Sequence, residues 1–254
     1  MIYVYTFYTD ESRIEYLKES ALLHNIDVTY LKQDTWNGYV DKIISMDAII
    51  KKHSDDDIIC FIDAYDVLIN QNVEYLLDNF KYYNCDLLIG AELNCYPMKY
   101  QRYYPHTDSK YKYVNSGGYI GYKHAIQRLF SWKPYNSIHN ICADGSDQAY
   151  FTEYFISEHS DKIRLDTECL IFQNMHLVNW NEISIVEGKV YNKVLNKKPC
   201  FIHFNGGTWQ QNNFENIMPI FINKMKSTLE NNSTDTLNDY SQIITSSCYP
   251  HPQL

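Results

Sequence analysis

The periodicity of apolar and polar positions changes several times along the first third of the chain. Four apolar stretches have the length and composition of strands: 1–8, 26–31, 58–62 and 86–91. Between them, apolar residues recur every three or four positions, as in amphipathic helices, over 11–24, 42–50 and 73–80. Strands that alternate with helices predict a parallel sheet with right-handed crossovers. We therefore expect a Rossmann-like α/β fold whose central sheet is mixed, mainly parallel and flanked by helices.

The rest of the chain is less regular. Its predicted strands are 113–121, 165–166, 170–174 and 200–205, and its predicted helices are 124–132, 148–155 and 217–229. An aromatic and polar stretch without clear periodicity, 94–112, precedes them, and loops of this length are often functional. We expect one main domain over 1–215, followed over 216–254 by a helix and a polar tail that is poorly ordered or makes contacts.

The apolar run 58–62 leads directly into two carboxylates, Asp63 and Asp66. The last residues of a buried parallel strand reach the edge of the sheet, where open α/β sheets bind ligands. Successive strand residues point to opposite faces, so the chain must turn near Ala64 for both acids to meet one cation. Paired carboxylates without thiolates suit a hard divalent ion such as Mn²⁺ or Mg²⁺. The alternative is a capping Asp followed by a turn Asp.

Charge and cysteine content narrow the class of protein. The chain has 31 Asp and Glu against 22 Lys and Arg, a formal net charge of −9, which argues against binding bare nucleic acid. The 7 Cys have neither CxxC nor metal-ligand spacing, so we expect reduced, buried thiols in a reducing compartment. There is no signal-peptide pattern and no apolar stretch long enough to span a bilayer. These features favour a soluble, cytoplasmic protein.

Further polar residues stand inside or beside apolar stretches. Asn115 precedes a glycine pair in a strand pattern, which usually marks a bulge or a close approach of backbone and ligand. His203 and Asn205 share one face of the last strand, where a single His is more often structural than a ligand. Asp147 precedes a helix that it could simply cap. Glycine-rich phosphate loops are absent from the sequence, so a metal and side chains would have to hold any phosphate.

Five motifs gain meaning when they are taken together. They are Phe-Ile-Asp-Ala-Tyr-Asp (61–66), Asn-Ser-Gly-Gly-Tyr-Ile-Gly (115–121), Asp-Gln (147–148), Ile-Phe-Gln-Asn (171–174) and Ile-His-Phe-Asn-Gly (202–206). In order and spacing, over roughly 1–209, they resemble the glycosyltransferase domain of the multifunctional procollagen lysyl hydroxylases. The family's dioxygenase domain has no counterpart in this sequence, so hydroxylase activity is not implied. The resemblance favours a stand-alone collagen glucosyltransferase, of a kind that a giant virus could encode.

The resemblance implies a GT-A fold, a UDP-sugar donor and Mn²⁺, with Mg²⁺ as the other candidate ion. The implied reaction transfers glucose from UDP-glucose to galactosyl-hydroxylysine in a collagen-like acceptor polypeptide. Asp63, Asp66 and His203 would bind the metal, and two carboxylates with an imidazole and diphosphate oxygens make a suitable octahedral set. Uracil would lie between the rings of Trp36 and Tyr65, although Trp36 could instead pack under its own loop.

Other implied residues would contact the donor phosphates and the sugar. Lys42 matches a lysine that could meet a phosphate, with a solvated helix residue as the alternative. Asn205 and Gly206, in the late motif, would also contact the donor. Asn115 would bond sugar hydroxyls above glycines that leave room for the sugar. Asp147 would lie near the transferred sugar.

Two departures from the family pattern concern the acceptor side. The family's acidic run is thinned here to Asp144-Gly145-Ser146-Asp147, and Tyr96 replaces a Trp in the family's Glu-x-x-Cys-Trp-Pro pattern.

The family reaction keeps the α configuration, which suggests attack from the face that the leaving group quits. A double displacement would need a carboxylate nucleophile, for which Asp147 is the first candidate and Asp144 a weaker one.

Two alternatives to this reaction stay open. One is another metal-dependent transferase, such as a UDP-galactose-dependent hydroxylysine galactosyltransferase or an enzyme that modifies another glycan. The other is a non-catalytic module that binds a UDP-sugar. The sequence leaves the oligomeric state open, a dimer included, and it leaves open whether the host cytoplasm or a virion would hold a viral protein.

Overall fold

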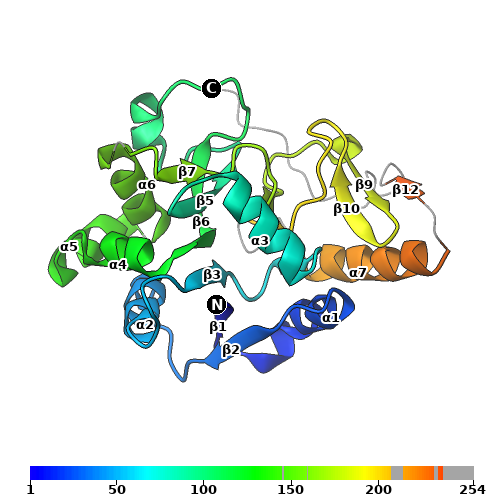
Figure 1. Cartoon of the computed structure of the whole chain (residues 1–254), viewed down its shortest axis with the longest axis horizontal. Helices are drawn as coiled ribbons and strands as arrows, with labels where there is room; N and C mark the ends of the chain where they lie inside the picture. The colour runs from blue at the N-terminus through cyan, green and yellow to red at the C-terminus, as the bar shows by residue number, and fades with distance from the viewer. Residues whose placement is uncertain (145, 159, 207–213, 232–233, 237–254) are drawn as a thin grey trace.

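The computed structural model describes residues 1–144, 146–158, 160–206, 214–231 and 234–236. Within them, six strands form a central sheet in the order β2–β1–β3–β6–β5–β7 (Figure 1). Their bounds are β1 Ile2–Tyr8, β2 Val28–Lys32, β3 Ile58–Ile62, β5 Leu87–Glu92, β6 Tyr113–Tyr122 and β7 Ile163–Leu165. Strand β6 runs antiparallel to both neighbours, while the other pairings are parallel. This confirms the expected mixed, mainly parallel sheet.

Helices cover both faces of this sheet (Figure 1). They are α1 Glu15–Leu23, α2 Val40–Ile50, α3 Val73–Tyr82, α4 Lys123–Ser131, α5 Tyr135–Ile141, α6 Gln148–Ser157 and α7 Phe214–Asn231. Helices α2, α4 and α6 share one apolar cluster with the sheet, and α1 and α3 share the other. A strand between two helical layers is apolar on both faces, which explains the uninterrupted apolar run of β3.

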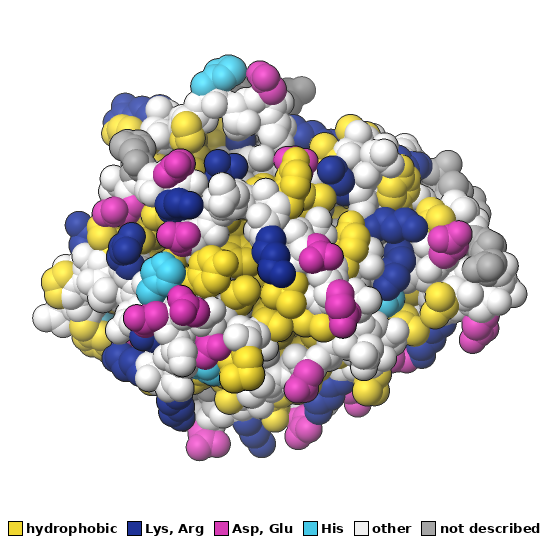
Figure 2. All heavy atoms as spheres, in the orientation of Figure 1, with side chains coloured by type: hydrophobic (Ala, Val, Ile, Leu, Met, Phe, Trp, Pro, Cys, Tyr) yellow, Lys and Arg dark blue, Asp and Glu magenta, His cyan; other side chains and the backbone are white. Residues whose placement is uncertain are grey.

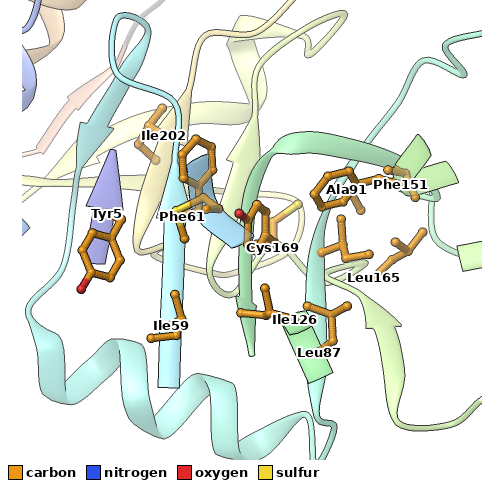
Figure 3. Close-up of a cluster of buried hydrophobic side chains, with 14 of the residues drawn as sticks. Tyr5, Ile59, Phe61, Leu87, Ala91, Ile126, Phe151, Leu165, Cys169 and Ile202 are labelled. Carbon is orange, nitrogen blue, oxygen red and sulfur yellow. The ribbon is translucent and has the colours of Figure 1, made fainter. Parts of the chain in front are cut away.

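The side chains of β3 show how the two clusters are divided. Ile59 and Phe61 point to the cluster of α2, α4 and α6, whereas Ile58, Cys60 and Ile62 point to the cluster of α1 and α3. Figure 3 shows Ile59 and Phe61 among other members of the first cluster, all of them buried. All five β3 side chains are therefore removed from water, so the strand is a fixed support for the carboxylates that follow it.

The second face is less completely covered. Figure 2 shows apolar side chains at the surface in the middle of this face, between α3 and the β1–β2 side of the sheet. Ile2, Tyr75 and Tyr122 pack against the cluster of α1 and α3 while staying partly exposed. The six cysteines among the described residues are buried and unpaired, as expected from their spacing.

Two smaller sheets complete the described part of the chain. One has the order β4–β11–β8, with bounds β4 Val67–Ile69, β8 Phe172–Asn174 and β11 Phe201–His203. The other has the order β10–β9–β12, with bounds β9 Ile183–Val186, β10 Lys189–Asn192 and β12 Thr234–Thr236. Helix α7 packs on this last sheet and on α1, and its Phe221 meets Phe204 edge to face at 5.0 Å. The predicted tail beyond β12 lies outside the described residues.

The glycine pair of β6 lies in a bulge, as its position in a strand pattern predicted. Ile89 of β5 pairs with Tyr119, but the next residue, Gly90, pairs with Asn115. The residues between these two partners, 116–118, therefore leave the ladder with β5 and turn toward the end of β3. The backbone N–H of Asp63 donates to the carbonyl oxygen of Gly117, at 2.8 Å. The bulge thus brings Gly117 to the predicted metal site.

Candidate active site

Asp63 and Asp66 lie where the chain leaves the central sheet for the smaller one. Strand β3 ends at Ile62, the chain bends, and β4 begins at Val67. The bend is the turn that two acids near one cation require. Val67 pairs with His203 of β11, which brings the imidazole beside the bend. His203 Nε2 lies 3.3 Å from Asp66 Oδ2 and 3.8 Å from Asp63 Oδ2.

The orientation of His203 is fixed from behind by Asn174. The Asn174 side-chain amide donates from Nδ2 to the carbonyl oxygen of Ala91 at 2.9 Å, so its Oδ1 must face His203. His203 Nδ1 then donates to that oxygen, at 2.8 Å. This bond places the proton on Nδ1 when the ring is neutral and leaves the lone pair of Nε2 facing both carboxylates.

Gly117 makes room for this group. A Cβ at this position would lie 2.2 Å from His203 Cε1 and 2.8 Å from Asp63 Oδ2, distances that no side chain can accommodate without movement. The space beside Gly117 is taken by His203 and Asp63, and the expectation that the glycines leave room for the sugar stays a prediction. Gly117 allows the strand to approach the carboxylate and the imidazole.

Lys42 and Asp147 face the same carboxylate cluster. Lys42 Nζ, on α2, donates to Asp63 Oδ1 at 2.5 Å and lies 3.8 Å from Asp147 Oδ2. Its side chain is largely buried, so the alternative of a solvated helix residue is wrong. Asp147 is 4 % exposed and makes no side-chain capping bond to α6, so the capping alternative is wrong too. Asp144 ends a short 3₁₀ turn, Cys142–Asp144, and its side chain lies outside the described part.

The charged groups in the cluster shift one another's pKa values. Burial raises the pKa of Asp63, and Lys42 opposes the shift. Burial would also raise the pKa of Asp66, but the His203 imidazolium outweighs it and holds this pKa below its usual range. Burial disfavours the cation of His203, yet the carboxylate of Asp66 raises its pKa above the usual value. A cluster that already holds one lysine and attracts a proton to histidine has an excess of negative charge.

Glu92, which the motif analysis did not assign to the site, organises its other side. It ends β5 as Asp63 follows β3, and it is 3 % exposed. Three side-chain amides donate to its carboxylate: Asn115 at 3.2 Å, Gln148 at 2.8 Å and Asn205 at 2.9 Å. Burial raises its pKa despite these donors. The signal in the sequence was an acid at the end of an apolar strand.

The Asn residues of the motifs are therefore partly committed to protein partners. Asn115 gives one N–H to Glu92, and its Oδ1 accepts from the backbone N–H of Gly117 at 3.0 Å. Asn205 Oδ1 accepts from the backbone N–H of His176 at 3.1 Å. Each of these amides can still form further hydrogen bonds, because an amide offers two donors and two lone pairs.

Gly206 turns the chain sharply after this motif. Its φ of +65° is in the left-handed region, and a Cβ there would lie 2.6 Å from Cγ of His176. His176 Nδ1 is 3.0 Å from the carbonyl oxygen of Gly206. A glycine is thus required both for the backbone conformation and for the close packing of the histidine.

The two aromatic residues expected at the base have different surroundings. Trp36 is 44 % exposed and meets the ring of Tyr39 edge to face at 5.8 Å. The hydroxyl of Tyr65 accepts from the backbone N–H groups of Thr9 and Asp10, and the guanidinium of Arg13 lies 4.4 Å from its ring centre. The ring of Tyr65 is therefore fixed by hydrogen bonds, whereas Trp36 is partly exposed, and the uracil site stays a prediction.

Solved structures with the same fold define the class of protein. The galactosyltransferase LgtC, in complex with donor and acceptor sugar analogues, matches with a TM-score of 0.51 and 12 % identity, over 89 % of this chain and 96 % of that one. A glycosyltransferase involved in the glycosylation of the major capsid of PBCV-1 matches with a TM-score of 0.50 and 11 % identity, over 89 % and 98 %. The fold is the GT-A fold of glycosyltransferases, as expected.

Sequence comparison defines the family. The family model described as PLOD GT domain matches residues 11–228, and the chain belongs to this family of glycosyltransferases. Protein R699 of Acanthamoeba polyphaga mimivirus is 31 % identical over 66 % of this chain and 36 % of its own length. The multifunctional procollagen lysine hydroxylase and glycosyltransferase of Caenorhabditis elegans is 30 % identical over 75 % and 28 %. Human procollagen-lysine,2-oxoglutarate 5-dioxygenase 1 is 29 % identical over 80 % and 30 %.

The chain thus corresponds to between about a quarter and about a third of the length of these relatives. The family membership applies to the glycosyltransferase part that is matched. None of the helices in the described part of the chain is both long enough and apolar enough to cross a membrane.

Proposed function

We propose that the chain is a Mn²⁺-dependent glycosyltransferase that transfers glucose from UDP-glucose to galactosyl-hydroxylysine of a collagen-like polypeptide, with retention of configuration. The observation that carries the proposal is the group of Asp63, Asp66 and His203. Each offers one ligand atom, and these atoms lie within 4.8 Å of one another. The group stands at the carboxyl end of β3, the edge at which such sheets bind ligands.

The donor atoms of this group fit a divalent ion of intermediate hardness. Two carboxylate oxygens and the Nε2 atom supply oxygen and imidazole ligands, without a thiolate. The imidazole favours Mn²⁺ over Mg²⁺, and the Asn174 bond holds it in the tautomer that a metal ligand needs. The metal would act as a Lewis acid that neutralises charge on the departing diphosphate. Lys42, which already contacts Asp63, supplies a second positive charge beside it.

The remaining residues have assignable roles around the donor. Trp36 and Tyr65 border the proposed uracil site, with the Tyr65 hydroxyl anchored by the backbone of Thr9 and Asp10. Asn205 and Gly206 form the turn after His203 and would line the diphosphate side. These assignments follow the motif positions, and hydrogen bonds orient the side chains of Tyr65 and Asn205.

The sugar would lie over the carboxylate of Glu92 and its amides. Asn115 has an N–H available for a sugar hydroxyl, and Asp147 closes the same side. Asp147 lies within 3.8 Å of the Lys42 ammonium, which reduces its nucleophilicity. This arrangement favours attack from the face that UDP leaves, with a UDP phosphate oxygen taking the acceptor proton. A glycosyl adduct trapped on Asp147 with a slow donor analogue would contradict that route.

The acceptor assignment is supported by relatives whose names include procollagen-lysine and a glycosyltransferase function. The test is a panel of UDP-sugars and peptides, with transfer read by mass spectrometry. We expect transfer of one hexose from UDP-glucose to a collagen-like peptide that bears galactosyl-hydroxylysine, only when Mn²⁺ is present. Transfer from UDP-galactose to unmodified hydroxylysine would instead establish the galactosyltransferase alternative. Tight binding of UDP and Mn²⁺ without turnover on any acceptor would establish a non-catalytic module.

A further inference from the structure

The loop after Glu92 forms a fixed surface beside the proposed sugar site. It includes a 3₁₀ segment, Met98–Tyr103, between β5 and β6. Tyr100 donates from its hydroxyl to Glu153 of α6, and the hydroxyl of Tyr104 lies 3.2 Å from the Thr152 hydroxyl. These buried or half-buried tyrosines anchor the segment to α6. We call the surface formed by residues 96–103 the η2 surface.

The η2 surface is connected directly to the site. The side-chain amide of Gln148 donates to Glu92 Oε1 at 2.8 Å and to the backbone oxygen of Tyr96 at 3.2 Å. Gln148 follows Asp147 in the chain. The side chain of Gln148 thus links the backbone of Tyr96 to the carboxylate of Glu92 at the proposed sugar site.

Large apolar side chains are exposed on the η2 surface. Tyr96 is 45 % exposed, Met98 is 73 % exposed and Tyr103 is 50 % exposed. Tyrosine and methionine are enriched at protein interfaces, and an anchored backbone keeps such side chains ready to bind without a large loss of entropy. Three of them within eight residues of an immobilised loop indicate a contact surface.

The charge of this surface is opposite to that of the whole chain. The chain has a net charge of −9, but the stretch 93–107 contains Lys99 and Arg102 and has neither Asp nor Glu. Both cations are exposed. Among the described residues, no carboxylate lies within ion-pair distance of either. Lys99 Nζ lies 5.0 Å from the ring centre of Tyr100, and Arg102 donates to the hydroxyl of Tyr103 at 2.6 Å.

A groove lined in part by later residues of the same loop, Pro105 and Thr107, has a similar composition. It has a volume of about 500 Å³, and its lining includes the rings of Tyr82 and Phe155 and the cations Lys112 and Arg164, with the one carboxylate of Glu168. It lies at the β7 edge of the sheet and is not lined by the metal-site residues. Cations and aromatic rings are therefore found at both the earlier and the later residues of the loop.

We propose that the η2 surface binds the acceptor polypeptide, and that this acceptor has Asp or Glu residues beside the residue to be glycosylated. The inference rests on the proposed function, because it assigns the acceptor of the same site. Unpaired cations attract carboxylates and increase the rate of encounter, while the exposed rings and Met98 bind the apolar part of an extended chain.

The experiment compares acceptors and charge variants of the full chain. Three collagen-like peptides bear one galactosyl-hydroxylysine flanked by Glu, by Gln or by Lys, and the KM of each is measured at saturating UDP-glucose and Mn²⁺. The test variant is Lys99→Glu with Arg102→Glu. The matched control is Lys52→Glu with Lys81→Glu, which makes the same change of charge at exposed lysines near the ends of α2 and α3.

We expect the Glu-flanked peptide to have the lowest KM with the wild-type chain. In the test variant its KM should rise about tenfold or more, and the rank order of the Glu and Lys peptides should reverse. The KM of UDP-glucose, and that of every peptide in the control, should stay near the wild-type value. An equal effect in test and control variants, or no preference among the peptides, would overturn the proposal. The proposed function would still hold if transfer itself is observed, and it fails separately if no peptide is glycosylated.

Discussion

At the scale of single residues, hydrogen bonds behind the site matter as much as the groups that face it. Asn174 presents its oxygen to His203 Nδ1 because its own N–H is bound by Ala91. Glu92 likewise fixes the amides of Asn115, Gln148 and Asn205 in a single orientation. The proposed ligands and sugar contacts are therefore oriented before any ligand binds, which lowers the entropy cost of binding.

We predict that Asn174→Ala weakens Mn²⁺ binding about 10- to 100-fold, because His203 loses the bond that selects its tautomer. Calorimetric titration of Mn²⁺ in the presence of UDP measures the change. Asn79→Ala removes a side-chain bond on α3, remote from the site, and serves as the control. Unchanged Mn²⁺ affinity in a folded Asn174→Ala variant would show that the bond does not orient a ligand.

His24 makes the stability of the fold sensitive to acid. It is buried beside Lys189, whose Nζ lies 2.7 Å from His24 Nδ1. Burial, with a smaller effect from the Lys189 cation, lowers the pKa of His24 from 6.5 to about 3. A lowered pKa means that the neutral ring is the stable form in the fold. The stability from this group is complete above pH 6.5 and is lost as the pH falls toward 3.

We predict that the free energy of unfolding falls by about 1–2 kcal/mol more in the wild type than in His24→Gln between pH 6.5 and about pH 5. Urea unfolding at several pH values measures the difference. Groups that titrate in both proteins cancel in this comparison. Parallel pH profiles for the two proteins would contradict a neutral, buried His24.

The sequence predicted the outward-facing groups of the site better than their supports. Asp63, Asp66 and His203 belong to motifs, and the structure brings them together. Glu92 ends an apolar strand and Asn174 belongs to a motif, but the partners that define their roles come from segments far away in the chain, so local spacing does not reveal those roles. The sequence allowed two interpretations of Lys42, a phosphate contact or a solvated helix residue. Only its contact with Asp63 excludes the solvated position.

At the scale of elements, the bulge of β6 is the feature that assembles the site. It turns residues 116–118 away from β5 and toward the end of β3. Gly117 then approaches His203 and Asp63, while a Cβ at Gly118 would lie 2.5 Å from the ring of Phe172, in the apolar cluster of α1 and α3. Adjacent glycines thus serve two purposes, one at the metal site and one in the core.

We predict that Gly117→Ala and Gly118→Ala differ in their effects. Both should lose about 1–3 kcal/mol of stability, because each added methyl meets atoms that cannot easily move. Gly117→Ala should also lose metal-dependent UDP binding, since the methyl displaces His203 and Asp63. Gly118→Ala should keep it at temperatures where the protein is folded. Thermal unfolding and UDP titration with Mn²⁺ test both points, and equal UDP binding by the two variants would contradict the assignment.

The sequence predicted most long elements but not the short ones. Strands buried on both faces and helices with one apolar face gave clear patterns, and β1, β3, β5, α2, α3 and α7 follow them. The first helix was expected from residue 11, but a 3₁₀ turn, Glu11–Arg13, precedes α1. Strands β4, β9 and β10 and helix α5 were not predicted. Their three to seven residues are too few for a period, and α5 buries a single apolar residue, Ile138.

At the scale of the whole molecule, negative charge is concentrated where a cation is needed and is absent where the acceptor is proposed to bind. The described carboxylate cluster sits at the carboxyl end of β3, and the η2 surface beside it is cationic. The fold and the family could be predicted from the sequence, because the five motifs occur in a fixed order along most of the chain. The identity of the donor and of the acceptor could not be predicted, because it depends on the shape of surfaces formed by several segments.

The proposed function requires that Asp63, Asp66 and His203 bind a metal on which the transfer reaction depends. The most direct test measures UDP release from UDP-glucose and the galactosyl-hydroxylysine peptide as Mn²⁺ is added to metal-free protein. The wild type, and the control Asp78→Ala with its exposed α3 carboxylate removed, should show saturable activation by Mn²⁺. Asp66→Ala should lose the activity and the metal-dependent binding of UDP. Full activity of Asp66→Ala in the presence of Mn²⁺ would contradict the proposed metal site and the proposed function.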